Sequence, residues 1–464
     1  MPDSRGRRVK ERDHLEEADD DSAGRTSVRR WHWLVAVLVS VVATATMALT
    51  LALSYEPVTQ YDEQAHFDYV ARIAAEHRLL SVGEVYGDDA VEEMRCRGIG
   101  LEESGEERST CGPELTPDVL PFRGVNYVAS YSPVFYGATA LVAGPLSSAT
   151  GMSLFVASRL ACVLWFVLGA GILTLALVRL RVSPALAAGA TILLASTPSF
   201  VLQGGAVTPD SVSLLAGAGA LLILTLRTSW GRRLAIMVAF GVVMGLVKSS
   251  FVPLGAVGVL MAVVFPLRGS SRQARWLALG WRRLVAGVVL AALPAVASGL
   301  ASVWRSSTLA PGASSDGGMS EVLRTTSSLG SEIVLGAIQL LHPLDSVAYI
   351  APPLWVFIAI LVHTVLLGGV ALVAVHPGLP VLGLARTLAI GAVASWVLMA
   401  LFLSVTFFVL FHVQGTQGRY ALPVMPLFLA AAVLALGDGR RLTIWVGVAS
   451  AIGCATALQA ILAV

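Results

Sequence analysis

Long apolar segments recur along most of the chain, and each is a candidate membrane helix. The first, residues 31–54, is long enough to cross the ~30 Å apolar core of a bilayer at ~1.5 Å per residue. Later apolar segments lie near residues 133–150, 155–178, 184–202, 211–226, 233–249, 251–266, 284–304, 350–375, 388–412, 420–436 and 442–463. The pattern predicts an all-α polytopic membrane protein.

The basic residues between these segments predict which loops face the cytoplasm. Arg29 and Arg30 precede the first segment, which favours a cytoplasmic N-terminus, and we expect a multi-pass protein of the plasma membrane. Alternate later loops carry Arg179, Arg181, Arg227, Arg232, Arg233, a cluster from Arg268 to Arg283, Arg386, Arg440 and Arg441. These loops share one side only if residues 133–150, which are short and contain Pro133 and Pro145, do not span. We therefore expect that segment to be re-entrant or surface-lying, which leaves about eleven spanning helices.

Three regions are expected outside the membrane. Residues 1–30 hold eight acidic and eight basic residues and predict a disordered, charged cytoplasmic tail before a membrane-embedded domain of residues 31–464. Residues 55–131 form the first extracytoplasmic loop, and residues 305–349 form the second large one. Cys96 and Cys111 lie in the first loop, where a disulfide is favoured; a zinc site is the alternative, but the paired ligand spacing is missing.

The composition excludes several classes of protein. Only 13% of the residues are charged and 56% are hydrophobic, which rules out a water-soluble enzyme, a nucleic-acid-binding protein and a disordered scaffold. Residues 132–464 carry just six acidic residues against 18 basic ones, so each acidic residue there can be considered individually.

The first candidate site follows the first membrane segment. Asp62, Glu63 and His66 fall within the first turn and a half of a predicted amphipathic helix, whose apolar stripe could lie along the membrane surface. A helix N-terminus favours ionised carboxylates, so Asp62 or Glu63 could act as a base or metal ligand. The alternative is that both acids only cap the helix.

Two further candidates are isolated charges beside apolar segments. Asp210 is the only acidic residue between Asp118 and Asp316, and an unpaired carboxylate there is costly. It could cap a helix, but Thr208 would do so at lower cost. Lys248, one of two lysines in the chain, could extend its ammonium group to the membrane interface or bind a phosphate group.

Arg419 repeats this pattern in a glycine-rich stretch, where backbone N–H groups and the guanidinium group can approach an anion together. His342 and Asp345 lie in the second large loop, and His342 is a weaker candidate for substrate binding. Most of these charged residues map to the outer face, against the positive-inside bias. Carboxylates beside cations suit deprotonation of an acceptor hydroxyl while a lipid-linked phosphate leaving group is stabilised.

The candidates belong to a series of short motifs. These are Asp62-Glu-x-x-His66-Phe, Tyr131-Ser-Pro-Val-Phe-Tyr136, Arg159-Leu160, Pro209-Asp210, Lys248-x-x-x-x-Pro253 and Gln417-Gly-Arg-Tyr420-x-x-Pro423. In this order they resemble a bacterial family of predicted membrane proteins, domain of unknown function 2142. That family looks like the GT-C superfamily of polyprenyl-phosphate-sugar glycosyltransferases, which includes oligosaccharyltransferases, protein mannosyltransferases and lipid A aminoarabinose transferases.

The resemblance implies a GT-C-like fold and an inverting sugar transfer on the outer face. It assigns Asp62 or Glu63 as the base or a metal ligand, and Asp210 as a second acid. The residues expected to bind substrate are His66, Lys248, Arg419, Tyr420, Gln417 and His342. A divalent cation, Mg²⁺ or Mn²⁺, between Asp62 and Asp210 is a hypothesis only.

Our hypothesis is a membrane glycosyltransferase that uses a lipid-linked sugar donor and a glycan, glycolipid or other envelope acceptor. It would work among membrane lipids and without a nucleic-acid partner. A transporter or flippase of a lipid-linked glycan is the alternative, as is a non-catalytic subunit of an envelope assembly complex. The subunit is favoured if Asp62 and Asp210 lie too far apart to share one site.

Overall fold

In the described part of this computed structural model, every regular element is a helix. The structure describes residues 31–59, 62–98, 111–112, 114–117, 119–264, 281–311, 328–342, 344, 352–375, 382–406, 408 and 417–463. The expected tail 1–30, Asp345 and much of the expected loop 305–349 lie outside these residues.

Eight helices in the described residues are long and apolar enough to cross a membrane. They are Trp31–Ser54, α5 (Leu154–Arg179), α9 (Trp230–Val247), Val285–Ser306 in α12 (Trp281–Ala291) and α13 (Leu293–Ser306), α16 (Pro353–Val375), Leu384–Thr406 in α17 (Leu382–Thr406), Gly418–Leu436 in η7 (Gly418–Val424) and α18 (Met425–Leu436), and α19 (Arg440–Leu462). Helices α6 (Pro184–Ala195) and α7 (Pro198–Gly205) meet at a bend of 76°, so together they form either a ninth, broken span or a re-entrant loop. Pro198 cannot continue the hydrogen-bond ladder of α6, which explains the break.

The number of spans differs from the eleven expected. Two of the expected segments form helices shorter than a span in the described structure, Pro209–Thr225 (η4, Pro209–Val212, and α8, Ser213–Thr225) and Ser249–Val263 (η5, Ser249–Phe251, and most of α10, Val252–Val264). Apolar composition alone does not distinguish a full span from a shorter buried helix. The segment expected to be re-entrant or surface-lying is α4 (Val134–Thr150), which contains Pro145 and is not among the eight spans.

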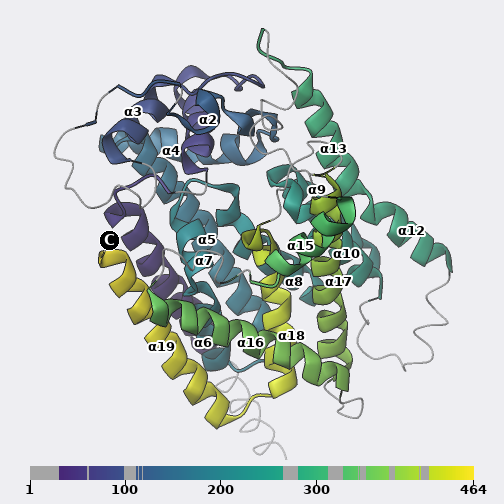
Figure 1. Ribbon diagram of the computed structural model, residues 1–464. Coiled ribbons are helices and arrows are strands. Elements are labelled where there is room, and N and C mark those ends of the chain that lie inside the picture. Colours follow the sequence, from purple (N-terminus) through teal and green to yellow (C-terminus); the bar gives the residue numbers. More distant parts are fainter. Residues whose placement is uncertain are drawn as a thin grey trace, which may run out of the picture.

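The first loop folds into a helical cap at one end of the bundle. In Figure 1, α2 (Glu63–Glu76), α3 (Asp88–Arg97) and α4 gather at this end, which we call the α2 end. The apolar stripe of α2 packs against α4 and α5, so it does not lie along a membrane surface. Phe67 is 2% exposed, and its ring meets that of Phe155 edge-on at 5.0 Å.

Backbone and side-chain hydrogen bonds tie the start of the second loop to this cap. Arg305, buried at the C-terminal end of α13, donates from Nε to the carbonyl of Ala129 at 3.0 Å. The N–H of Val82 donates to the carbonyl of Thr308 at 2.9 Å. The remaining described elements are η2 (Pro121–Gly124), η3 (Tyr127–Ser130) and α15 (Leu329–Gln339).

Helix α8 and η7 approach each other closely at Gly217. A methyl group there would overlap the carbonyl oxygen of Pro423 and would also meet the ring of Pro426 at 2.6 Å. Because η7 carries Arg419, the small residue at position 217 sets the distance between two elements that bear candidate site residues.

We expect Gly217→Ala to lower the free energy of unfolding by about 1–3 kcal/mol, since the backbone of η7 would have to move. Thermal unfolding in detergent measures the change. Gly447→Ala in α19 is the matched control, because no atom lies within 4 Å of the added methyl group. Equal melting temperatures for the two variants would contradict the expected close contact.

Candidate functional site

Asp210 lies at the centre of a group of opposite charges. Its carboxylate Oδ1 accepts a hydrogen bond from Lys248 Nζ at 2.5 Å, and its Oδ2 lies 3.3 Å from Arg419 Nε. Asp210 does not serve as a helix cap, because the side chain of Thr208 accepts the bond from the Asp210 N–H and caps η4. The 1%-exposed Asp210 side chain is thus neutralised by two cations.

Asp62 joins this group through the same arginine. Its Oδ2 accepts a hydrogen bond from Arg419 Nη2 at 3.1 Å, although the two residues are 357 positions apart. Asp62 precedes α2 with φ 64° and makes no side-chain cap bond, so its carboxylate is not used to cap the helix. A non-glycine residue with positive φ is uncommon and indicates a local constraint.

The four-charge cluster, as we name Asp62, Arg419, Asp210 and Lys248, therefore alternates in sign from one member to the next. Its members come from the start of α2, from η7, from η4 and from the residue between α9 and η5. The Tyr420 ring supports both cations, with Lys248 Nζ 4.5 Å and Arg419 Cζ 5.6 Å from its centre. Asp62 is the most accessible member, with 26% of its side chain exposed.

The carboxylate of Glu63, next to Asp62, is occupied by structural hydrogen bonds. Arg159 of α5 binds it at two points, with Nε to Oε1 at 2.8 Å and Nη2 to Oε2 at 2.7 Å. The N–H groups of Thr59 and Val207 each donate to one of the carboxylate oxygens at 2.8 Å. The carboxylate is 0% exposed, so it holds α2, α5 and the segment before η4 together.

The charge state of Glu63 follows from these contacts. Burial alone would raise the pKa of Glu63, but the charge and hydrogen bonds of Arg159, with the bonds from Thr59 and Val207, outweigh burial and lower it. Arg159 also donates to the carbonyls of Tyr55 and Pro57. The pair stays ionised and pins the start of the first loop to α5.

His66 faces the same region from α2. Its Nδ1 lies 2.9 Å from the hydroxyl of Tyr136, and its ring lies 6.3 Å from that of Tyr131. Burial lowers the pKa of His66 well below its usual range, and the charges of Lys248 and Arg419 lower it further. The imidazole is therefore neutral, and it does not add a charge to the cluster.

The other expected binding residues are placed differently. Tyr420 is buried beside the two cations, whereas Gln417 is exposed, and its backbone carbonyl accepts a hydrogen bond from the N–H of Tyr420. His342 is exposed after α15, with its ring 6.3 Å from that of His363 in α16.

Two side chains near Asp210 were not expected from the sequence to contribute. Both amide atoms of Gln203 in α7 and the hydroxyl of Ser213 in α8 are buried without a hydrogen-bond partner in the described structure. Ser213 lies one helical turn before Gly217, on the face that packs against η7. A buried polar group without a partner costs about 1–3 kcal/mol, and these two lie in α7 and α8, the helices on either side of η4 in the chain, which carries Asp210.

Comparison with known proteins identifies the family. The family described as predicted membrane protein (DUF2142) matches residues 46–428. The chain belongs to this family. No curated protein matches this DUF2142 member.

Two solved structures are similar to the DUF2142 protein, both of ArnT from Cupriavidus metallidurans. The apo structure has a TM-score of 0.37 and 16% identity and covers 88% of this chain and 77% of ArnT. The structure bound to undecaprenyl phosphate has a TM-score of 0.36 and 17% identity with the same coverage.

The residues present do not fit a divalent cation between Asp62 and Asp210. The guanidinium group of Arg419 already lies between the two carboxylates, and Lys248 takes the other oxygen of Asp210. A divalent ion at the same place would be repelled by both cations.

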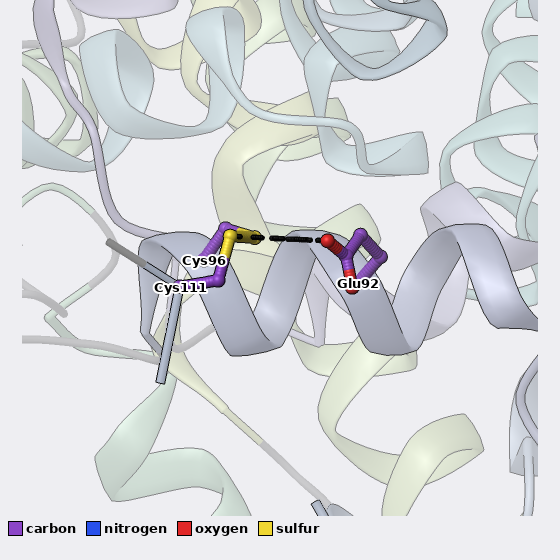
Figure 2. A group of neighbouring side chains, drawn as sticks. All are labelled: Glu92, Cys96 and Cys111. Atoms are coloured by element: carbon purple, nitrogen blue, oxygen red, sulfur yellow. Dashed lines mark hydrogen bonds between the residues drawn. A yellow bond between two sulfur atoms is a disulfide. The ribbon is translucent and has the colours of Figure 1, made fainter. Parts of the chain in front are cut away.

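Cys96 and Cys111 form a disulfide in the first loop of the DUF2142 protein. Figure 2 shows Glu92, one turn earlier on α3, with a carboxylate oxygen 3.2 Å from the sulfur of Cys96. Among the described residues, these three side chains are the one group close enough to hold a metal ion. Because the sulfurs are bonded to each other, this group is a structural link and not a zinc site.

Two cavities lie away from the four-charge cluster. One of 990 Å³ lies among the first helix, α6 and α19, and one of 630 Å³ lies between α2 and α4. Neither is lined by a member of the cluster. We place the candidate site at the cluster, because apolar grooves between membrane helices contact lipid whether or not chemistry takes place there.

Proposed function

We propose that this DUF2142 protein is a GT-C-type membrane glycosyltransferase, which transfers a sugar from a polyprenyl-phosphate-linked donor to a cell-envelope acceptor with inversion. The four-charge cluster carries this proposal. An accessible carboxylate and two cations from distant parts of the sequence meet at one end of a membrane bundle. This combination suits removal of a proton from a hydroxyl group beside a departing phosphate.

Asp62 is the base in this proposal. Its side chain is 26% exposed, whereas that of Glu63 is 0% exposed and accepts four hydrogen bonds. The acceptor hydroxyl gives its proton to Asp62 as its oxygen bonds to the anomeric carbon. The bond from that carbon to the phosphate oxygen breaks, and its electron pair leaves with the polyprenyl phosphate.

Lys248 and Arg419 stabilise the phosphate that leaves. A lysine has three donor hydrogens and an arginine has five, so both retain donors after binding Asp210 and Asp62. Asp210 keeps the two cations close together and would itself not react. Its position between them explains why a buried acid is tolerated there.

Gln203 and Ser213 support a ligand with neutral polar groups over a bare phosphate. An amide offers both a donor and an acceptor, which matches two hydroxyl groups on a sugar ring. We assign these side chains to the sugar and Lys248 with Arg419 to its phosphate. A shared site is supported because Asp62 and Asp210 both contact Arg419, which disfavours a non-catalytic subunit with separated acids.

A product assay tests the proposal. The purified protein is given a panel of undecaprenyl-phosphate-linked hexoses and pentoses together with cell-envelope extract as the acceptor. We expect free undecaprenyl phosphate to appear and labelled sugar to pass into the extract. A flippase would instead move the intact labelled donor across a proteoliposome membrane without releasing undecaprenyl phosphate, and that result would overturn the proposal.

Phosphate binding should weaken as pH rises through about 8. Burial lowers the pKa of Lys248 to about 8; Asp210 opposes this shift and Arg419 adds to it. Below that pH the ammonium group is charged, and above it the charge is lost. A phosphate monoester has its second pKa near roughly 6, so its own charge is nearly constant over this range.

Titration with undecaprenyl phosphate at pH values from about 7 to about 9.5 measures this dependence. Lys248→Arg is the matched variant, because a guanidinium group stays charged throughout. We expect its affinity to remain level while that of the native protein falls. Parallel curves for both proteins would contradict the role of Lys248.

A further inference from the structure

A long groove lies at the opposite end of the bundle from the four-charge cluster. Arg159 of α5 contacts Glu63 at the α2 end, and Arg179 ends the same helix 20 residues later, about 30 Å away. The groove opens there, among the first helix, α6 and α19, and has a volume of 990 Å³. We call it the α6–α19 groove.

Its walls change from polar to apolar along their length. His32, Arg181 and Asp438 line the outer part, whereas Ala36 and Ala43 of the first helix line the deeper part. The groove extends along the first helix for about three turns, from residue 32 to residue 43. The shape therefore suits an elongated ligand with an apolar chain and a polar head.

The mouth of the groove is positively charged. Arg181 lines it, Arg179 lies two residues before, and Arg440 and Arg441 begin α19 just after Asp438. All four arginines are exposed, and none has a carboxylate partner among the residues that the structure describes.

The one acidic residue in the wall, Asp438, offsets only one of the four positive charges. Asp438 is engaged by Ser183, whose N–H and hydroxyl donate to its two carboxylate oxygens at 2.9 and 2.7 Å. Those bonds join the start of α6 to the start of α19, and in the described part of the chain the carboxylate of Asp438 makes no salt bridge to the nearby guanidinium groups.

We propose that the α6–α19 groove binds a phospholipid with an anionic head group. One acyl chain lies between the first helix and α19, and the phosphate faces Arg181 and its neighbouring arginines. Basic residues at a membrane surface attract anionic lipids, and the groove volume is within the ~300–1,000 Å³ range of ligand pockets. This site is about 30 Å from the proposed sugar-transfer site and does not depend on that function.

Lipid titration of the full-length, delipidated protein tests the proposal by native mass spectrometry. Phosphatidylglycerol and phosphatidylcholine with identical acyl chains are compared. We expect phosphatidylglycerol to bind at least about tenfold more tightly. Equal retention of both lipids would overturn the proposal.

Two variants separate the head-group and chain contacts. Replacing Arg179, Arg181, Arg440 and Arg441 with alanine should remove the preference for phosphatidylglycerol. Ala43→Phe keeps every charge but fills the deeper groove, and it should weaken binding of the same lipid. Binding unchanged in Ala43→Phe would overturn the groove as the site.

The matched control removes exposed positive charge elsewhere. Arg227→Ala with Arg232→Ala changes two exposed arginines, one just before α9 and one in its first turn, that do not line the groove. We expect this variant to retain the native preference for phosphatidylglycerol. A loss as large as that of the Arg179, Arg181, Arg440 and Arg441 variant would show that overall charge decides, against the proposal.

Discussion

Asp62→Asn should lower the rate of sugar transfer by about 10²–10⁴-fold while leaving the protein folded. The substitution keeps the size of the side chain and removes its ability to accept a proton. Asp62 makes no cap bond, and its carboxylate is bonded by Arg419 and by the hydroxyl of Tyr127, both of which can still donate to the amide oxygen of asparagine. The release of free undecaprenyl phosphate measures the rate, and thermal unfolding measures the fold.

Asp89→Asn is the control for this experiment. It makes the same chemical change at an exposed acid in the first turn of α3, within the same loop. We expect transfer at the native rate. If Asp62→Asn also transfers sugar at the native rate, Asp62 is not the base.

Glu63→Gln should mainly destabilise the fold, whereas Asp62→Asn should mainly lower the rate of transfer. Removal of one partner from a buried ion pair typically costs about 3–5 kcal/mol, because the remaining charge has no counter-ion. Here Arg159 would keep its charge at 2% side-chain exposure. The free energy of unfolding and the yield of folded protein in detergent measure the loss.

A second substitution separates the ion pair from its surroundings. Arg159→Met combined with Glu63→Gln removes both charges, so the double variant should be more stable than the sum of the two single losses predicts. Strictly additive losses would contradict direct coupling between the two residues.

The same pair predicts a dependence of stability on pH. The folded pKa of Glu63 is lowered from its ordinary 4.5, so its stabilising contribution is complete above that value. As pH falls below 4.5 towards the folded pKa, the unfolded state takes up a proton first and the contribution is lost. Glu63→Gln should show a flatter melting-temperature profile across this acidic range.

Much of the fold follows from the apolar pattern. The difference between the expected and the observed number of candidate spans has a physical cause. Eight segments form helices that can span, because length and hydropathy together demand burial in lipid or protein. The expected number, about eleven, exceeds the eight or nine candidate spans of the described residues, because Pro209–Thr225 and Ser249–Val263 are apolar helices shorter than a span there. Their flanking polar residues, among them Asp210 and Lys248, are used by the four-charge cluster.

The candidate site was only partly predictable. Isolated charges beside apolar segments singled out Asp210, Lys248 and Arg419, because such charges need a partner or a function, and the start of a predicted helix singled out Asp62 together with Glu63. The sequence could not distinguish Asp62 from Glu63, since that distinction depends on Arg159, which is 96 residues from Glu63. A tandem pair of acids gives no signal of which one is buried.

Gln203 was missed for a related reason. An amide in an apolar stretch has no recognisable pattern, and its lack of a hydrogen-bond partner is visible only in three dimensions. A search for polar residues inside short helices next to proline would have found it, since Gln203 lies between Pro198 and Pro209.

The single guanidinium group shared by Asp62 and Asp210 has a consequence for the timing of the proposed transfer. While Arg419 holds Asp62, one oxygen of that carboxylate is engaged in the ion pair. A donor phosphate that draws the guanidinium towards itself releases the acid at the moment when an acceptor can use it. Substrates would therefore add in a fixed sequence, donor before acceptor, and idle loss of the sugar to water would be suppressed in the empty protein.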